Sequence, residues 1–462
     1  MQQAKEVKAA SPMLHPSVSS NPKDTLKYQP GFGNDFCSEA LPGALPIGQN
    51  QPQKCPYKLY AESVTGTVFT SPRSFGVGNQ RCWLYRIRPS IAIQKSFVKY
   101  DVNPYVAADF TASGIGEPMN PKPQFYGPFD MPKDKKVDFV DGLRTVAGAG
   151  SAQLRFGVAY HTYVANASMT NRAFYSADGD MMIFPAAGRL RVQTEFGFMS
   201  VAPNELCVVQ RGLRFSIALE DGGEARGFVL EIFDGHFELP DLGVIGSNGL
   251  SHARDFMTPV AAYEDTQAAW TIINKFQGHL WKVEMDHSPF DVVAWHGNYA
   301  PYKYDMNRFQ CIGSLSHDHT DPSLFCMLTV RGPQPGVALV DVLNIDPPRW
   351  TSMSHTYNIP YYHRNSASEF VMGIRGSFPP GAVLYVPPMS PHGSGRDAFE
   401  KATNKVQAGP YREGDGQTLL MWESCLMVSP TKWALDNKGP LGQIDYSEST
   451  GKTLIKYFDG KL

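Results

Sequence analysis

The sequence predicts a mainly β protein, in which a β-rich N-terminal domain is followed by a smaller β domain. Short apolar runs with strand-like alternation recur along most of the chain, whereas helical periodicity is weak. The 36 prolines and 42 glycines are spread through these runs rather than gathered in one linker, as expected when turns join many short strands. At 462 residues the chain is long enough for two or three domains.

Composition narrows the possible partners and locations. A net charge of −2 and an isoelectric point near 6.6 argue against nucleic acid or an anionic membrane as the main partner. The sequence contains no run of 18 apolar residues and no signal-peptide core in its first 20 residues, so a cytoplasmic protein is expected. The last three residues resemble a peroxisomal ending except at Gly460. The seven cysteines are scattered without a CxxC pair, which favours reduced thiols.

The chain divides into three expected segments. Residues 1–27 are polar and are expected to form a mobile tail, residues 28–285 an N-terminal β domain, and residues 286–462 a second β domain. One helix is expected over residues 259–276. Strands are expected in the first domain over 81–91, 181–219 and 227–239, and in the second over 325–332, 336–345, 369–378, 381–388 and 419–428.

The second domain carries the spacing of a cupin, a jelly-roll β fold. Glu369 stands seven residues before Gly376, a strand-like run follows, and Pro387 then stands five residues before His392. In a cupin, a glutamate lies on a strand before a glycine turn, and a proline-led turn brings in a histidine from a later strand. A cupin-like C-terminal domain that holds a metal is therefore expected.

The first domain repeats this spacing without the ligands. Gly188 occupies the position of the glycine turn, and the three ligand positions then fall on Tyr175, Met181 and Phe215. These residues offer no set of hard donors for a metal, so the first domain is expected to be a degenerate cupin-like barrel with an apolar interior and no metal.

The candidate metal ligands are His363, Glu369 and His392. Two imidazoles and one carboxylate on one side of a divalent iron leave three adjacent positions for a substrate and oxygen. His363 and Glu369 are an even number of residues apart, so on one strand they face the same side. Spacing alone leaves the alternative that the first two are surface residues and His392 a loop histidine.

Three other segments contain candidate histidines. His296 lies in an aromatic-rich segment, where it could shuttle protons or could equally be a core histidine bonded to the backbone. The pair His317 and His319 could bind a metal, but no carboxylate follows at the cupin distance, so a turn is the favoured interpretation. The same holds for His355, eight residues before His363.

Several long motifs stand in order along residues 28–440, and through them the chain resembles the homogentisate dioxygenase family. The resemblance covers nearly the whole sequence. The motifs are GFGNDFCSEALPGALPIGQNQPQKCPYKLYAE, FTSPRS, FYSADGD, PNELCVVQRG, HFELPDLGVIGSNGL, VAWHGNYAPYKY, PPRW and YYHRNSASEF.

The resemblance implies a function and a set of roles. The family's Fe(II) ligands fall on His363, Glu369 and His392, and His392 would also contact the substrate. The family's proton acceptor falls on His296. The implied reaction is the cleavage of homogentisate by O2 to maleylacetoacetate, in tyrosine and phenylalanine catabolism, by a hexamer built as a dimer of trimers.

The match departs from the family near the expected site. The stretch after residues 374–376 is shorter by about seven residues, and the family's substrate-contacting tyrosine has no counterpart unless Phe378 marks its place. Val386 stands where the family has a histidine beside the ligands. Two alternatives therefore stay open: a related dioxygenase for another hydroquinone or phenol, and a catalytically silent protein that binds metal.

Overall fold

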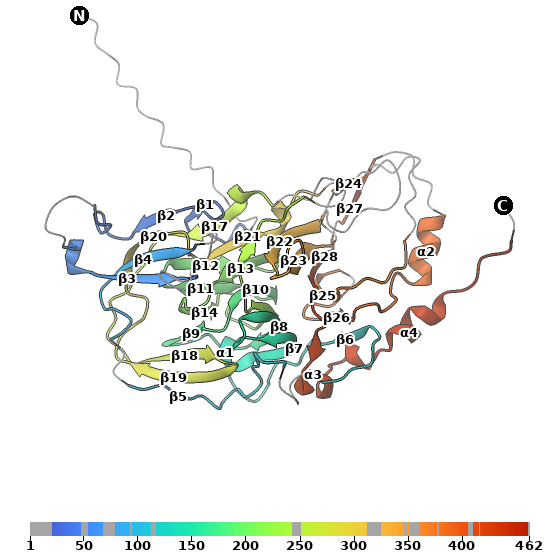
Figure 1. The fold of residues 1–462 in the computed structure, drawn as a ribbon, viewed down its shortest axis with the longest axis horizontal. Coiled ribbons are helices and arrows are strands. Elements are labelled where there is room, and N and C mark those ends of the chain that lie inside the picture. Colours follow the sequence, from blue (N-terminus) through green and yellow to red (C-terminus); the bar gives the residue numbers. More distant parts are fainter. Residues whose placement is uncertain are drawn as a thin grey trace, which may run out of the picture.

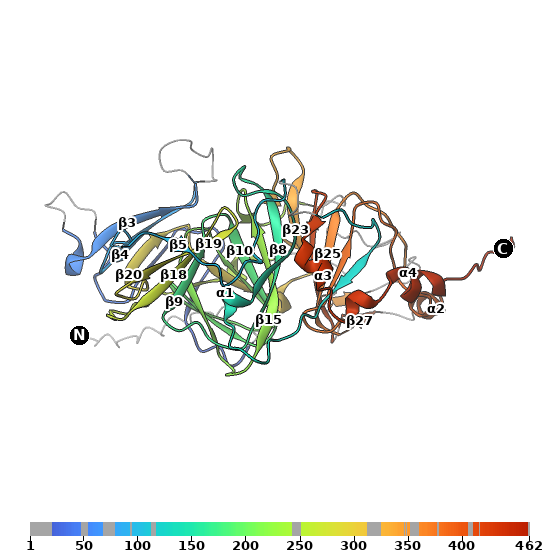
Figure 2. The same cartoon turned by 90° about the horizontal axis from the view of Figure 1, so that it is seen from below.

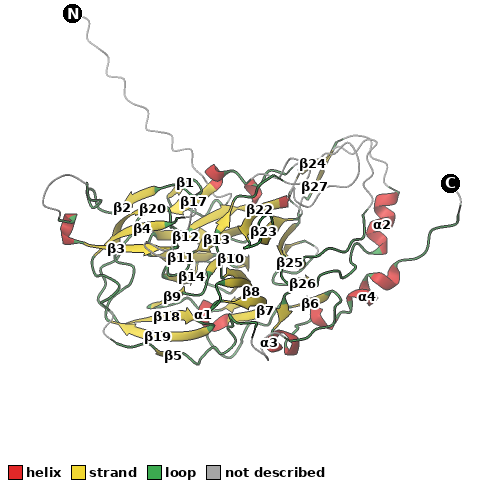
Figure 3. Cartoon of the chain, in the orientation of Figure 1, coloured by secondary structure: helices red, strands yellow, loops and turns green. Residues whose placement is uncertain are grey.

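The predicted fold class is confirmed by the computed structural model, in which strands dominate and the few helices are short (Figures 1 and 3). The N-terminal half lies at one end of the longest axis and the C-terminal half at the other (Figures 1 and 2). In the described residues the sheets stay open rather than closing into barrels, an arrangement consistent with cupin-like domains. The structure describes residues 21–47, 54–67, 79–92, 95–111, 117–242, 251–311, 325–345, 347, 349–351, 360–376, 378–404, 410–414 and 416–460.

The middle layer of the molecule, here called the central sheet, joins nine strands within the described residues. Its strand-to-strand contacts are antiparallel. The strands are, in spatial order, β1 (Tyr28–Pro30), β17 (Phe256–Pro259), β21 (Tyr302–Asp305), β13 (Glu205–Val209), β10 (Asp180–Ala187), β15 (Ala225–Ile232), β8 (Phe156–Ala165), β7 (Leu143–Ser151) and β29 (Ser429–Pro430).

Two further sheets belong to the N-terminal half. The outer sheet orders β12 (Gly197–Val201), β11 (Leu190–Thr194), β14 (Phe215–Leu219), β9 (Arg172–Ser176), β18 (Trp270–Phe276), β19 (His279–Met285) and β5 (Val98–Lys99). The small sheet orders β2 (Phe36–Glu39), β20 (Val292–Gly297), β4 (Arg81–Arg86) and β3 (Tyr60–Thr65).

The remaining layer, called the C-terminal sheet, carries the segment with the candidate ligands. It orders β16 (Phe237–Glu238), β22 (Cys326–Arg331), β23 (Ala338–Asn344), β28 (Thr418–Ser424), β25 (Ser368–Arg375), β26 (Val383–Val386) and β6 (Gln124–Tyr126), and a separate pair joins β24 (Arg349–Thr351) to β27 (Tyr411–Glu413).

The helical elements are short. None of those in the described ranges has the length and apolar character that a membrane crossing needs. They are the α-helices α1 (Phe139–Gly142), α2 (Arg396–Thr403), α3 (Lys432–Asp436) and α4 (Tyr446–Ser449), and the 3-10 turns η1 (Pro56–Lys58), η3 (Ala253–Asp255), η4 (Met306–Arg308), η6 (Leu441–Gln443) and η7 (Gly451–Thr453).

Alternation along the central strands builds two apolar layers. Met182 and Phe184 on β10 pack into the core shared with the C-terminal sheet, whereas Met181 and Ile183 on the same strand pack into the core shared with the outer sheet. Successive side chains of a strand point to opposite faces, so a strand buried on both faces has no polar side. The central sheet therefore lies between the outer sheet and the C-terminal sheet.

Strands from each half of the chain complete sheets in the other half. β6 and β16, which precede residue 286, pair with β26 and β22 in the C-terminal sheet, and β29 pairs with β7 in the central sheet. β20 and β21, which follow residue 286, pair with N-terminal strands. The domain limits at residues 27, 285 and 286 stay a prediction.

The helix expected over residues 259–276 is wrong. β17 ends at Pro259, no regular element is assigned over residues 260–269, and the rest forms β18. Trp270 and Ile272 lie buried on one side of β18, and the strand hydrogen-bonds to β19 and β9. β-branched residues and alternate burial favour a strand, and the long-range pairing overrides the local helical pattern.

The positions that replace ligands in the N-terminal half are apolar or only partly polar. Met181 and Phe215 are buried in one apolar cluster, and Tyr175 packs against a neighbouring one. However, the buried Glu231 lies directly across the strand pair from Met181. Its Oε2 forms an ion pair with Nζ of the buried Lys275 at 2.8 Å. The sequence predicts a wholly apolar interior here, and the structure instead contains a buried ion pair.

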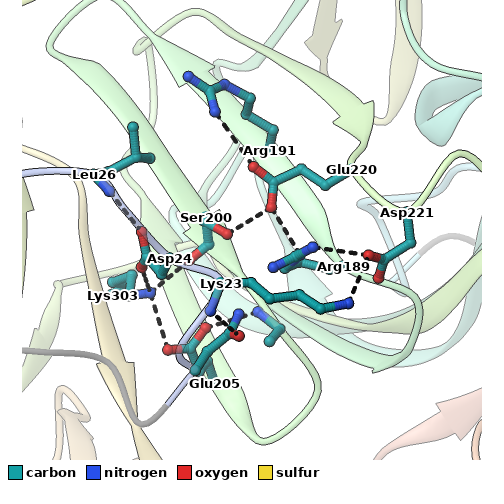
Figure 4. Close-up of polar contacts among 12 residues, drawn as sticks. Lys23, Asp24, Leu26, Arg189, Arg191, Ser200, Glu205, Glu220, Asp221 and Lys303 are labelled. Atoms are coloured by element: carbon teal, nitrogen blue, oxygen red, sulfur yellow. Dashed lines mark hydrogen bonds and ion pairs between the residues drawn. The ribbon is translucent and has the colours of Figure 1, made fainter.

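The N-terminal segment is anchored by a buried lysine (Figure 4). The side chain of Lys303 is 0% exposed, and its Nζ lies 2.6 Å from Asp24 Oδ2 and 2.9 Å from Glu205 Oε1. Asp24 also accepts hydrogen bonds from the Leu26 backbone N–H and from the Tyr28 hydroxyl. These contacts hold the chain against the central sheet immediately before β1 begins.

Candidate metal centre

A backbone bridge and a strand bring the three predicted ligands together. Glu369 lies near the start of β25, which ends just before Gly376, where φ is +103° and glycine is favoured. His363 precedes the strand, and its backbone pairs with that of His392 through two N–H···O bonds of 3.1 and 3.2 Å. This pairing sets the two imidazoles beside each other, with ring centroids 4.0 Å apart.

The donor atoms of the three side chains converge. One ligand atom from each of His363, Glu369 and His392 lies within 4.8 Å of the others, and this is the one such group of three found in the described residues. His392 Nε2 lies 3.1 Å from Glu369 Oε2, and His363 Nε2 lies 3.8 Å from Glu369 Oε1. Two imidazole nitrogens and a carboxylate in this arrangement suit a divalent transition metal.

Electrostatics prepare the group for a cation. Burial alone would raise the pKa of Glu369, but its interactions with the His363 and His392 imidazoles lower it to about 2, so the carboxylate is ionised at neutral pH. Burial would lower the pKa of His392, but its contacts with Glu369 and with the Ser390 carbonyl raise it. A bound divalent metal would replace the proton that Glu369 favours on the His392 imidazole.

Neighbouring groups orient the ligands. The side-chain amide of Asn365 donates to Glu369 Oε1, and His392 Nδ1 lies 3.0 Å from the Ser390 carbonyl. A proton on Nδ1 donated to that carbonyl leaves Nε2 free to bind a metal. After His392, a Cβ added at Gly393 would lie 2.5 Å from a ring carbon of Tyr362, so a larger residue there requires Tyr362 to shift.

The group stands at the edge of a wide hollow on the outward face of the C-terminal sheet. Phe370 and Trp422 on the inward face pack against Tyr160 of the central sheet. The opposite face lines a cavity of about 970 Å³. Among the side chains in its wall are His363, Asn365 and Glu369, together with Asp341, Leu343, Val371, Met421 and Glu423.

Two acids in this wall have raised pKa values, mainly because they are buried. Burial, followed by the charges of Glu369 and Asp341, raises the pKa of Glu423 to about 7. Burial also raises the pKa of Asp341. The hollow thus gathers carboxyl groups on the side that carries the candidate ligands, and Glu423 holds a proton more readily there than an exposed glutamate does.

Val386 and Phe378 mark the two departures from the family pattern. Val386 is buried and stands directly across the strand pair from Glu369, so an aliphatic group faces the ligand from that side. Phe378 packs edge-on against Phe125 of β6, with ring centroids 6.0 Å apart. Phe378 does not belong to the wall of the hollow.

His296 is not brought to the ligand group within one chain. It lies on β20 in the small sheet, near one end of the longest axis, and strands of the central sheet lie between it and β25 (Figures 1 and 2). Its Nε2 lies 3.1 Å from the Tyr85 hydroxyl, and the two rings stack at 5.8 Å. It is partly exposed, so a partner surface can reach it.

Some predicted positions cannot be placed, and some important ones were missed. His317, His319 and His355 lie outside the described residues. Glu423 and Asp341 drew no attention in the sequence, because their relation to Glu369 is a cross-strand register and not a spacing along the chain. Asn365 lies inside the quoted YYHRNSASEF motif, and its position four residues before Glu369 was the available signal.

Comparison with known proteins identifies relatives over nearly the whole chain. The family profile described as homogentisate 1,2-dioxygenase N-terminal matches residues 27–306, and the profile described as homogentisate 1,2-dioxygenase C-terminal matches residues 307–455. The human homogentisate 1,2-dioxygenase is 49% identical over 423 residues, covering 89% of this chain and 92% of that protein. The mouse homogentisate 1,2-dioxygenase is 48% identical over 424 residues, with the same coverage of 89% and 92%.

Similarity to solved structures is much weaker. The Escherichia coli protein Ylba is 8% identical with a TM-score of 0.28, covering 68% of this chain and 95% of that one. A cupin 2 conserved barrel domain protein from Leptotrichia buccalis is 6% identical with a TM-score of 0.25, covering 65% and 92%. Likenesses of this size support no conclusion.

Proposed function

Because the chain belongs to the homogentisate 1,2-dioxygenase family, we propose that it opens the ring of homogentisate with O2 at an Fe(II) held by His363, Glu369 and His392. The product would be maleylacetoacetate, in the cytoplasmic breakdown of tyrosine and phenylalanine. The observation that carries the proposal is the convergence of three donor atoms within 4.8 Å on a sheet face that opens into a hollow.

The residues present fit Fe(II). One ionised carboxylate and two imidazoles are the donor set of non-haem iron oxygenases, and these three side chains would hold the ion while leaving room for other ligands. The Nδ1 contact of His392 selects the tautomer whose Nε2 can bind. When bound, the iron supplies neighbouring positions for a phenol oxygen and O2, and lets electrons pass from the ring to oxygen.

The protein's own groups hold and orient the reactants. Asn365 fixes the carboxylate of Glu369, and the backbone bridge fixes the two imidazoles, so the ligand geometry is set before the substrate arrives. His392 would also contact the bound ring, as the family resemblance implies. The wall of the hollow, with Val371 and Met421, offers apolar contacts to that ring.

His296 is proposed as the acceptor of the phenol proton. Since it lies far from the ligand group of its own chain, it would act on the ligand group of a second copy. This agrees with the homo-oligomer, a dimer of trimers, that the family resemblance implies. Tyr85 would hold the His296 ring through the contact at 3.1 Å.

A mixing experiment tests the role of His296. The variants His296→Ala and His363→Ala are each expected to be inactive alone. Mixed after reversible dissociation, they should regain activity, because some interfaces then combine an intact histidine with an intact ligand group. Mixed oligomers that form but stay inactive would contradict the shared site.

The altered surroundings of the ligands favour a second candidate, a dioxygenase for another hydroquinone or phenol. Val386 cannot hydrogen-bond a ligand or substrate, and Phe378 packs on Phe125 without a hydroxyl. Losing one positioned hydroxyl costs about 0.5–1.5 kcal/mol, which corresponds to a loss of roughly tenfold or less. Slower turnover of homogentisate than in ordinary family members is therefore expected, but not complete loss.

The decisive test is anaerobic reconstitution with Fe(II), followed by oxygen-electrode assays. The substrates are homogentisate, gentisate and related hydroquinones, and His392→Ala serves as the metal-free control. Oxygen uptake with homogentisate that depends on iron supports the first candidate, and uptake only with another hydroquinone supports the second. No uptake at full iron occupancy would favour a silent metal-binding protein.

A further inference from the structure

Three carboxylates stand in one straight row across the outward face of the C-terminal sheet. Glu423 on β28 pairs directly with Glu369 on β25, and on its other side it pairs directly with Asp341 on β23. All three side chains line the same hollow. Glu423 is therefore the first residue of the wall beyond the candidate ligand, one strand away.

Glu423 has an unused capacity to accept hydrogen bonds. Like charges placed directly across a strand pair are unfavourable, so such a row is kept where it serves a ligand or where donors offset it. In the described part of the chain, no side chain or backbone N–H donates a hydrogen bond to the carboxylate of Glu423, although the residue is partly buried. A donor supplied by a bound molecule would satisfy it.

The spacing of the row matches a hydroquinone. Neighbouring strands lie about 4.8 Å apart, and directly paired side chains start at about that separation. The two hydroxyl oxygens of a 2,5-dihydroxyphenyl ring lie on opposite sides of the ring, slightly farther apart than one strand spacing. A ring with one hydroxyl at the ligand group therefore places the other beside Glu423, while Asp341 lies a further strand away.

The neighbours of Glu423 suit the ring between the two hydroxyls. Val371 and Met421 lie two residues from Glu369 and Glu423 on the same strands, so they face the same side. Both line the hollow. Their side chains offer a flat apolar contact beside the polar row.

We propose that Glu423 is a specificity-determining residue that accepts a hydrogen bond from the second hydroxyl of a 2,5-dihydroxyphenyl substrate, the hydroxyl that faces away from the ligand group. The inference rests on the proposed function and adds to it the feature by which a hydroquinone is told from a simple phenol. It holds in either ionisation state, because a carboxyl group retains an acceptor oxygen when protonated.

The test compares two ligands that differ by one hydroxyl. Homogentisate and 2-hydroxyphenylacetate carry the same side-chain carboxylate and the same first hydroxyl, and only homogentisate has the second. Their affinities for the Fe(II)-loaded protein are measured anaerobically by titration calorimetry, so no turnover occurs. Both ligands carry the same carboxylate, so Glu423 repels both equally. This repulsion therefore does not change the ratio of the two affinities.

The wild-type protein should bind homogentisate about 10- to 100-fold more tightly than 2-hydroxyphenylacetate, the range for a hydrogen bond to a charged group. Glu423→Met, which keeps the length of the side chain, should bring the ratio to within about threefold of one. Glu423→Gln keeps a neutral acceptor oxygen and should retain a smaller preference of about 2- to 10-fold. Asp341→Asn, one strand farther along the row, is the matched control and should keep the wild-type ratio.

Iron content is measured for each variant before titration, so that a loss of metal is not mistaken for a loss of recognition. A wild-type ratio near one overturns the proposal whatever the variants do, and so does a Glu423→Met protein that keeps the full preference. Oxygen uptake by the same wild-type preparation reports on the proposed function separately. Uptake without a preference for the second hydroxyl would refute the role of Glu423 alone.

Discussion

Substitutions around the buried Lys303 should lower the stability of the fold by different amounts. Lys303 is enclosed by two carboxylates, those of Asp24 and Glu205, and carries the only positive charge among these three side chains. Lys303→Met would leave two buried acids facing each other, and removing one partner of a buried ion pair costs on the order of 3–5 kcal/mol.

Asp24→Asn is expected to cost less. Asp24 binds Lys303 and the Leu26 N–H through separate oxygens, so the single amide oxygen of asparagine can accept from only one of them. Glu205 still balances the lysine, so about 1–2 kcal/mol is expected. The adjacent Lys23→Gln is the matched control, since Lys23 is 71% exposed and its 3.7 Å pair with Asp221 is at the surface. That change should cost at most about 0.5 kcal/mol.

Hydrogen exchange and thermal unfolding measure the three variants. Asp24→Asn should speed exchange mainly at residues 24–30, because the segment opens locally, whereas Lys303→Met should lower the unfolding temperature of the whole protein. The reasoning is refuted if Asp24→Asn destabilises as much as Lys303→Met, or if neither differs from Lys23→Gln.

The remaining predictions concern buried charge and the ligand group. Burial alone would raise the pKa of Glu231, but Lys275 and His161 lower it to about 2 from an ordinary value of 4.5, so its stabilising contribution is complete above 4.5 and is lost as the pH falls toward 2. Glu231→Gln should therefore flatten the acid side of a plot of unfolding temperature against pH, and an unchanged acid limb would count against the assignment. Asn365→Leu should weaken Fe(II) binding by about 10- to 100-fold in a chelator competition, while Glu369 remains in place. Gly393→Ala should reduce iron occupancy, because the added Cβ meets Tyr362 at 2.5 Å, and an occupancy equal to wild type would show that the turn yields without cost.

Periodic and spaced features were predictable from the sequence, and features of register were not. The alternation in residues 181–219 correctly indicated strands, and the seven-residue step from Glu369 to Gly376 correctly placed a strand before a glycine turn. The segment around Trp270 was wrong, because its pairing with β9 and β19 depends on strands distant in sequence.

The same distinction holds at the site. His363, Glu369 and His392 could be chosen because motif and spacing agree, and the structure brings them together. Glu423 could not be chosen, because nothing in the linear sequence states which residue of β28 faces Glu369. The position of His296 in another sheet could not be foreseen either, since the domain limits were drawn along the chain and the sheets cross them.

The exchange of strands between the two halves bears on how the chain can be made and divided. During synthesis, β6 leaves the ribosome long before its partner β26 exists, and β16 likewise precedes β22. A nascent N-terminal half therefore carries two strand edges that stay open until the rest of the polypeptide arrives, and open edges invite wrong pairing. Separate expression of either half would leave its sheets short of strands, so the two halves are expected to reach a soluble folded state only when they are present together.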